Sequence, residues 1–131
     1  GALSKDWLRI RRLKRRGSGN LIFPGYVEDI IASYSAADIF LMPSYAETFG
    51  LVILEALSCG LPVIARDIPE FRDIFGTAIL YFSSQEDAAA LLDDRPLLSR
   101  YGSGARSYSG GYDIRDTAKK HLGLYKELVG T

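Results

Sequence analysis

The order of secondary structure can be read from residues 38–65, which run DIFLMPSYAETFGLVILEALSCGLPVIA. The apolar run 38–42 has the length of a buried strand. A helix is expected over 50–59, because Gly60 follows it and a proline comes soon after, the usual order at a helix end. Residues 62–65 then read as a second strand. A strand, a helix and a strand in succession favour a parallel sheet.

The same alternation continues on both sides of this stretch. Short apolar strands are expected at 21–23 and 78–82, and short helices at 29–36 and 70–75. In the helix at 29–36, Ile30, Ile31 and Tyr34 are expected to face inward. The glycine-rich and serine-rich stretch 102–111 is expected to be a loose loop. Further helices are expected from Ser4 or Asp6 to Arg16 and over 84–92, 96–108 and 114–129.

Strands that are apolar along their whole length require a sheet covered on both faces, so we predict a doubly wound α/β fold. Ligands of such sheets bind beyond the carboxyl ends of the strands. The loops at 24–27, 43–50 and 66–70 are therefore the places to search for a site.

Length and composition narrow the class of protein. The chain has 131 residues, 47% hydrophobic and 24% charged, which fits a single ordered domain and excludes a disordered chain. One cysteine, Cys59, excludes an internal disulfide, and with one histidine, His121, there is no zinc-ligand cluster. Both residues are interpreted as packing or surface residues. No apolar run is long enough to span a bilayer.

The positive charge is concentrated at the amino end, where residues 1–20 carry seven basic side chains and one acidic one. A solvated helix face is the favoured interpretation of this run. The alternative is contact with an anionic membrane surface through Arg9 to Arg16, on a helix whose Trp7 would lie in the lipid. We expect no nucleic-acid partner, because the tyrosines near the carboxyl end are too scattered to stack bases.

Glu55 is the first candidate functional residue. All its neighbours from Leu51 to Leu57 are apolar, so the helix is predicted to be packed nearly all round, and an unpaired buried carboxylate would be costly. Its partner would be a backbone amide, an arginine such as Arg66, or a ligand.

The loop before this helix adds a second carboxylate and an anion site. Glu47 precedes Glu55 by eight residues, and Phe49-Gly50-Leu51 opens the helix with unpaired amides that suit a phosphate. A carboxylate accepts hydrogen bonds from vicinal hydroxyls. Together, Glu47, the anion site and Glu55 fit a ligand that has hydroxyls at both ends and phosphates between them. A nucleotide sugar has this layout.

These residues resemble a known family, the retaining group 1 (family 4) glycosyltransferases of GT-B fold, in their carboxyl-terminal, donor-binding domain. The family signature is Glu, seven residues, Glu, as in Glu47 and Glu55. The match extends over about 20–82. Its further elements are Tyr34-Ser-Ala-Ala-Asp38, Pro43-Ser44, Glu47-Thr48-Phe49-Gly50-Leu51, Glu55-Ala56 and Cys59-Gly-Leu-Pro-Val-Ile-Ala65.

The resemblance implies roles for individual residues. Glu55 would bind the ribose hydroxyls of the donor, and Glu47, the catalytic candidate, would contact the transferred sugar. The amides of Phe49, Gly50 and Leu51 would meet the sugar or diphosphate. The other donor-binding candidates are Gly25, Tyr26, Ser44, Thr48 and Arg66.

The implied reaction is retaining transfer of a hexose from a nucleoside diphosphate sugar, such as a UDP-sugar, with no obligatory metal or other cofactor. Amides and cationic side chains would stabilise the leaving diphosphate. The expected location is cytoplasmic, with the inner membrane face as a possible contact of the basic stretch.

Two departures from the family pattern stand out. After the strand at 62–65 the family usually has a Gly-Gly turn, whereas this chain has Arg66-Asp67-Ile68-Pro69, similar to bacterial diacylglycerol glucosyltransferases that work on membrane surfaces. The family's diphosphate-clamping Arg and Lys come from the first strand region, and this chain begins in the helix after that strand.

We therefore expect residues 1–131 to be one Rossmann-like, nucleotide-sugar-binding domain that lacks the usual first strand, with a helical tail at about 84–129. It would work with an N-terminal acceptor domain and be inactive in isolation. One alternative is a non-catalytic nucleotide-sugar-binding subunit that pairs with a separate acceptor-domain protein. Another is a structural α/β module that binds no nucleotide.

Overall fold

The computed structural model describes residues 20–112. The predicted helices at either end, the basic stretch, Trp7 and His121 lie outside these residues. The described elements, in chain order, are α2 (Ile30–Ser35), β1 (Phe40–Met42), α3 (Leu51–Ser58), β2 (Val63–Arg66), α4 (Pro69–Phe75), β3 (Leu80–Phe82), α5 (Gln85–Asp93), α6 (Arg95–Ser109) and the 3-10 helix η1 (Gly110–Tyr112).

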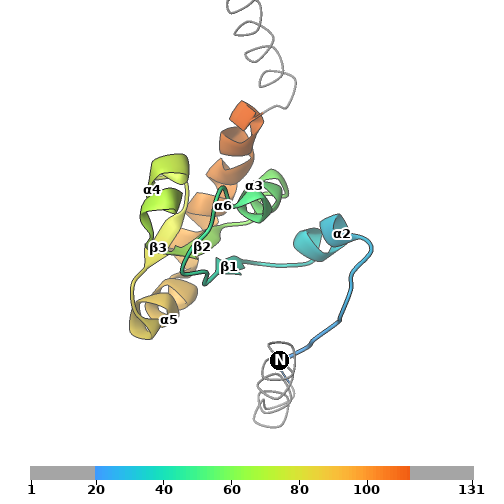
Figure 1. The fold of residues 1–131 in the computed structure, drawn as a ribbon. Helices are drawn as coiled ribbons and strands as arrows, with labels where there is room; N and C mark the ends of the chain where they lie inside the picture. The colour runs from blue at the N-terminus through green and yellow to red at the C-terminus, as the bar shows by residue number, and fades with distance from the viewer. Residues whose placement is uncertain (1–19, 113–131) are drawn as a thin grey trace, which may run out of the picture.

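The strands form a parallel sheet in the order β1-β2-β3 (Figure 1). Leu41 lies opposite Ile64, and Ala65 lies opposite Tyr81. Each strand is followed by a helix, as parallel pairing requires a crossover connection. The predicted parallel α/β architecture is confirmed.

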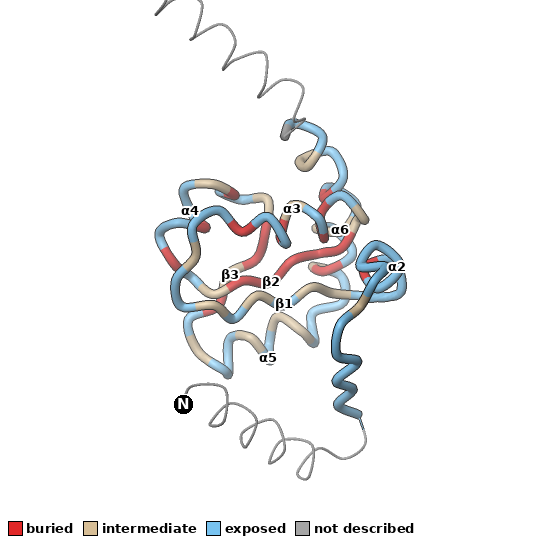
Figure 2. The backbone as a smooth tube through the Cα atoms, turned by 45° about the vertical axis from the view of Figure 1, so that its right-hand side comes forward, coloured by how far each residue is buried: buried red, intermediate tan, exposed pale blue. Residues whose placement is uncertain are grey.

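Helices cover both faces of this sheet. Alternate residues of β2 face opposite sides, so Val63 and Ala65 pack with α3 and α4, whereas Ile64 packs with α5. The chain in Figure 2 is coloured as buried along β2, the central strand. Helix α6 joins both layers, since Leu98 belongs to one cluster and Ala105 to the other.

Local signals fix the helix ends. The Asp29 carboxylate accepts from the backbone N–H of Ala32 (2.9 Å) at the start of α2. Ser84 and Asp87 form a reciprocal capping box at the start of α5. Pro69 opens α4, and Gly76 ends it with a positive φ of 50°.

Two predicted segments are wrong. Residues 21–23 form no strand: Leu21 is 54% and Ile22 84% exposed, and the segment joins no sheet that would take its backbone hydrogen bonds. The stretch 102–111 is not a loop but the second half of α6 and η1. The reason lies at Gly102, where an added Cβ would stand 3.3 Å from the Gly60 carbonyl oxygen. This glycine serves close helix packing, not flexibility.

Two predicted burial patterns are also wrong. Of the α2 residues expected to face inward, Tyr34 is buried, but Ile30 and Ile31 are exposed. Helix α3 is not packed all round, because it buries one face through Ile53, Ala56 and Leu57 and leaves Leu51 64% exposed. Glu55 lies on the exposed side.

Candidate functional site

The predicted site lies at the carboxyl edge of the sheet. The loop 43–50 runs from the end of β1 to the start of α3, and Arg66 is the last residue of β2. Because the strands are parallel, these carboxyl ends share one edge. The fold therefore brings Ser44, the segment 47–51 and Arg66 to one side of the sheet.

Gly50 makes the turn into α3 possible. Its φ of 74° and ψ of 46° are left-handed, a conformation that favours glycine. A Cβ at this position would also stand 3.0 Å from Cε1 of Phe71 in the core. Within residues 20–112 no side chain caps the amino end of α3, so the amides that precede that of Ile53 are left for a ligand.

Glu55 has a partner that the sequence alone does not indicate. The Tyr34 hydroxyl donates to Oε2 of Glu55 over 3.0 Å. Burial raises the pKa of Tyr34 to about 12, and the hydrogen bond to the carboxylate adds to the rise. The phenol is thus a stable donor at neutral pH that orients the carboxylate. The inward position of Tyr34 in α2 was the available signal, but nothing in the pattern linked it to α3.

Glu47 lies half-buried in the loop 43–50. Within residues 20–112 its carboxylate makes no hydrogen bond or ion pair. Nearby, the Ser44 hydroxyl lies 3.8 Å from the Met42 sulfur, a contact that turns it back toward β1. The Glu47 carboxylate is therefore left for a ligand, whereas the Ser44 hydroxyl has only its acceptor positions left.

Arg66 joins three segments of the edge. Its Nε donates to the Pro43 carbonyl oxygen (3.1 Å). Its guanidinium carbon lies 3.9 Å from the centre of the Tyr45 ring and 5.0 Å from that of Phe82. Arg66 is not the partner of Glu55, because its contacts are with the loop and β3. Tyr45 is a second residue that the sequence analysis did not single out.

The remaining candidates differ in their surroundings. Thr48 and Phe49 are exposed beside Gly50. Gly25 and Tyr26 are not packed into this site: Tyr26 is 93% exposed, and a Cβ on Gly25 would meet no atom within 4 Å. In Figure 1 the chain before α2 runs away from the sheet.

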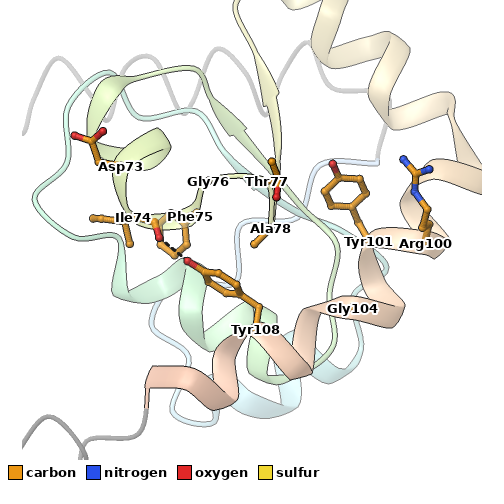
Figure 3. A pocket seen from close by; sticks show the side chains of 10 residues that line it. All are labelled: Asp73, Ile74, Phe75, Gly76, Thr77, Ala78, Arg100, Tyr101, Gly104 and Tyr108. Atoms are coloured by element: carbon orange, nitrogen blue, oxygen red, sulfur yellow. Dashed lines mark hydrogen bonds between the residues drawn. The ribbon is translucent and has the colours of Figure 1, made fainter.

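A separate cavity of about 750 Å³ opens between the end of α4, the turn 76–78 and α6 (Figure 3). It adjoins the amino end of β3, opposite to the carboxyl edge of the sheet at which the loop 43–50 lies. The Tyr108 hydroxyl donates to the Ile74 carbonyl oxygen at its wall, and Asp73 and Arg100 lie on opposite sides of it. None of the predicted site residues lines it.

Comparisons with known proteins agree with the predicted family. The family model described as "Glycosyl transferases group 1" matches residues 1–94. The processive diacylglycerol alpha-glucosyltransferase of Acholeplasma laidlawii is 42% identical over 66 residues, 49% of this chain and 20% of that protein. The D-inositol 3-phosphate glycosyltransferase of Nocardia farcinica is 37% identical over 112 residues, 78% of this chain and 24% of that protein.

A solved structure extends the similarity to the fold. Sucrose-phosphate synthase from Thermosynechococcus elongatus matches with a TM-score of 0.78 and 27% identity, over 96% of this chain and 35% of that one. Among the described residues, no helix is long and apolar enough to cross a membrane. The chain spans about a quarter or less of the length of the two curated relatives. The family model covers most of the sequence, and the chain belongs to the group 1 glycosyltransferases.

Proposed function

We propose that this chain binds a nucleoside diphosphate sugar at the carboxyl edge of its sheet, as the donor-binding part of a retaining glycosyltransferase. One observation carries the proposal: within residues 20–112 the amino end of α3 is uncapped, and two carboxylates that are not buried, Glu47 and Glu55, flank it in the sequence. Family membership supports sugar transfer as the reaction class.

In this proposal Glu55 holds the ribose. Each carboxylate oxygen has two acceptor positions, and the Tyr34 hydroxyl takes one position on Oε2. Oε1 and the second position of Oε2 remain for the two vicinal ribose hydroxyls. Hydrogen bonds to an ionised carboxylate are among the stronger ones in proteins, so this contact supplies affinity for the nucleoside.

The diphosphate lies at the amino end of α3. Backbone N–H groups and the helix dipole favour an anion there, and Gly50 has no side chain to block its approach. During transfer, negative charge develops on the leaving diphosphate, and donors already aimed at it lower the barrier. Glu47, which comes before this turn, contacts the transferred hexose. This chemistry requires no metal, which remains a prediction.

The match covers only 20% and 24% of the two curated relatives. The rest of their length supports the proposal that a second domain takes part in the reaction. A transferase also needs a surface that holds the acceptor, and we propose that a second domain supplies it, so that the chain binds donor without turnover in isolation. The alternative, a non-catalytic subunit, predicts that a separate acceptor-domain protein forms a complex with this chain. Co-expression with such a partner followed by a transfer assay distinguishes the two.

Calorimetric titration with UDP, UDP-glucose and GDP-mannose tests donor binding. We expect Glu55→Gln to weaken nucleotide binding by roughly 10-fold or more, because one partner of a charged hydrogen bond is lost. Asp93→Asn, at the far end of α5, is the matched control and should leave affinity unchanged. Binding that is insensitive to Glu55→Gln but lost in Asp73→Asn would place the nucleotide in the other cavity and refute the proposal.

A further inference from the structure

Arg66 is the last residue of β2, and its side chain reaches across the carboxyl edge of the sheet to the backbone of Pro43. We propose that Arg66 is a positioning residue: together with Tyr45 it fixes the loop that carries Glu47. The role of Arg66 in holding the loop is independent of the ligand. An effect of Arg66 on donor binding rests on the proposed function.

The contacts of Arg66 show how the loop is held. Its Nε–H donates to the Pro43 carbonyl oxygen at the start of the loop, over 3.1 Å. One face of the guanidinium lies 3.9 Å from the centre of the Tyr45 ring, and the Phe82 ring lies 5.0 Å away. Phe82 is buried and belongs to β3, so it provides a rigid base. The side chain thereby links the loop to two strands of the sheet.

Tyr45 depends on this contact. It is 80% exposed, and its hydroxyl makes no hydrogen bond within residues 20–112. Its stack on the guanidinium is therefore the main interaction that holds the ring. Glu47 follows two residues later and has no hydrogen bond of its own within the described part of the chain. The position of Glu47 thus depends on its neighbours in the loop, of which Tyr45 is held by Arg66.

The interaction requires an arginine and not just a positive charge. A guanidinium is planar, stacks on aromatic rings and donates through Nε at the same time, whereas a lysine ammonium is a point charge without a flat face. A lysine at this position would keep the charge, but it cannot lie flat on the Tyr45 ring and donate to the Pro43 carbonyl oxygen at the same time. Arg66→Lys therefore separates positioning from simple attraction of a phosphate.

Arg72 offers a matched control. It is also an arginine on an aromatic ring, with its guanidinium carbon 4.0 Å from the centre of Tyr81, and it forms two hydrogen bonds with Asp67. Its contacts join α4 to β3 and to the segment after β2, and none of them reaches the loop 43–50. Arg72→Met removes a comparable stack without touching the loop.

The test is native-state digestion of the whole chain with a glutamate-specific protease, with the cleavage rate after Glu47 followed by mass spectrometry. Cleavage after Glu70 and Glu86 in the same digest reports general unfolding. We expect cleavage after Glu47 to rise about tenfold in Arg66→Met and Arg66→Lys, which lose the stack and the hydrogen bond together. Tyr45→Ala loses the stack alone, and we expect a rise of about threefold there. Tyr45→Phe, which keeps the ring, and Arg72→Met should cleave at the wild-type rate.

Each outcome decides the inference. A wild-type cleavage rate in Arg66→Met or in Arg66→Lys overturns it. It is also overturned if the rate increase in the double variant equals the product of the increases in Arg66→Met and Tyr45→Ala, because the two residues would then act independently. Because Tyr45 is exposed, Tyr45→Ala tests the loop even if Arg66→Met fails to fold.

UDP titration of the same variants then separates the two proposals. If the loop loosens while the wild-type chain binds no nucleotide, the positioning role stands and the proposed function fails. If the wild-type chain binds UDP and the loop variants cleave at the wild-type rate, the proposed function stands and the positioning role fails.

Discussion

The hydroxyl of Tyr34 in α2 donates a hydrogen bond of 3.0 Å to the Glu55 carboxylate in α3. Tyr34 is 7% exposed and packs edge-on against Phe40 of β1, with ring centres 5.7 Å apart. A residue held by the core thus fixes the direction of a carboxylate that faces solvent. The ribose contact that we assign to Glu55 should therefore depend on Tyr34.

Tyr34→Phe tests this dependence. The ring and its packing remain, but the donor to Glu55 is lost, so we expect UDP affinity to fall about fivefold, which corresponds to about 1 kcal/mol for one hydrogen bond. Calorimetric titration measures the change. Tyr101→Phe, on α6 away from Glu55, is the control and should bind UDP as the wild type does. Unaltered affinity in Tyr34→Phe would show that Glu55 needs no orientation by Tyr34.

The same hydroxyl gives a dependence of stability on pH. The pKa of Tyr34 is about 12 in the folded chain, against an ordinary value of 10.0. Between these values the unfolded chain releases a proton that the folded chain retains, so the Tyr34 contribution is complete below pH 10 and is lost as pH rises toward 12. Urea unfolding at successive alkaline pH values should show the wild type and Tyr34→Phe converging, and a constant gap would contradict this.

Gly50→Ala should be destabilising by roughly 2 kcal/mol, because alanine is strained in the left-handed conformation and its Cβ would press on the Phe71 ring. Gly104→Ala provides the opposite case. Gly104 lies inside α6 with open space around it, so alanine should stabilise by about 0.5–1 kcal/mol. Chemical denaturation measures both. If the two variants shifted in the same direction, the conformational argument for Gly50 would be wrong.

Gly102→Ala examines the close approach of α6 to the end of α3. A Cβ there would lie 3.3 Å from both the Gly60 carbonyl oxygen and Cδ of Pro62. Backbone and proline atoms cannot move aside easily, so we expect a loss of about 1–2 kcal/mol in spite of alanine's higher helix propensity. Thermal unfolding beside Gly104→Ala gives the comparison, and stabilisation by both substitutions would rule out tight packing at 102.

The sequence predicted the strand and helix order of the middle of the chain because apolar runs and turn residues are local signals. The strands Phe40–Met42 and Val63–Arg66 and the helix between them lie within a residue or two of their expected places. The segment 21–23 has the same local pattern but forms no strand, because strand formation also needs a neighbour. The glycine-rich stretch at 102–111 is mostly helix, because Gly102 is needed for the close approach of Gly60 and Pro62 and not for flexibility.

For the site, the motif predicted which residues gather at the carboxyl edge but not what holds them. The contact between Tyr34 and Glu55 spans 21 positions, and that between Pro43 and Arg66 spans 23. Neither pair follows a helical or strand spacing, so no periodicity could show it. The segment Arg66-Asp67-Ile68-Pro69, which departs from the glycine turn usual in the family, was the one visible sign of the contacts that Arg66 makes at this edge.

The backbone of Gly50 rests directly on the rings of Phe71 and Phe75, both of which are almost completely buried. The turn that we assign to the diphosphate and the hydrophobic interior thus share one surface, with no layer of side chains between them. A substitution that replaces either phenylalanine with a larger or smaller side chain should therefore alter ligand affinity as well as the free energy of folding. Screens of this protein for altered binding will then also recover variants whose primary defect is in the hydrophobic core.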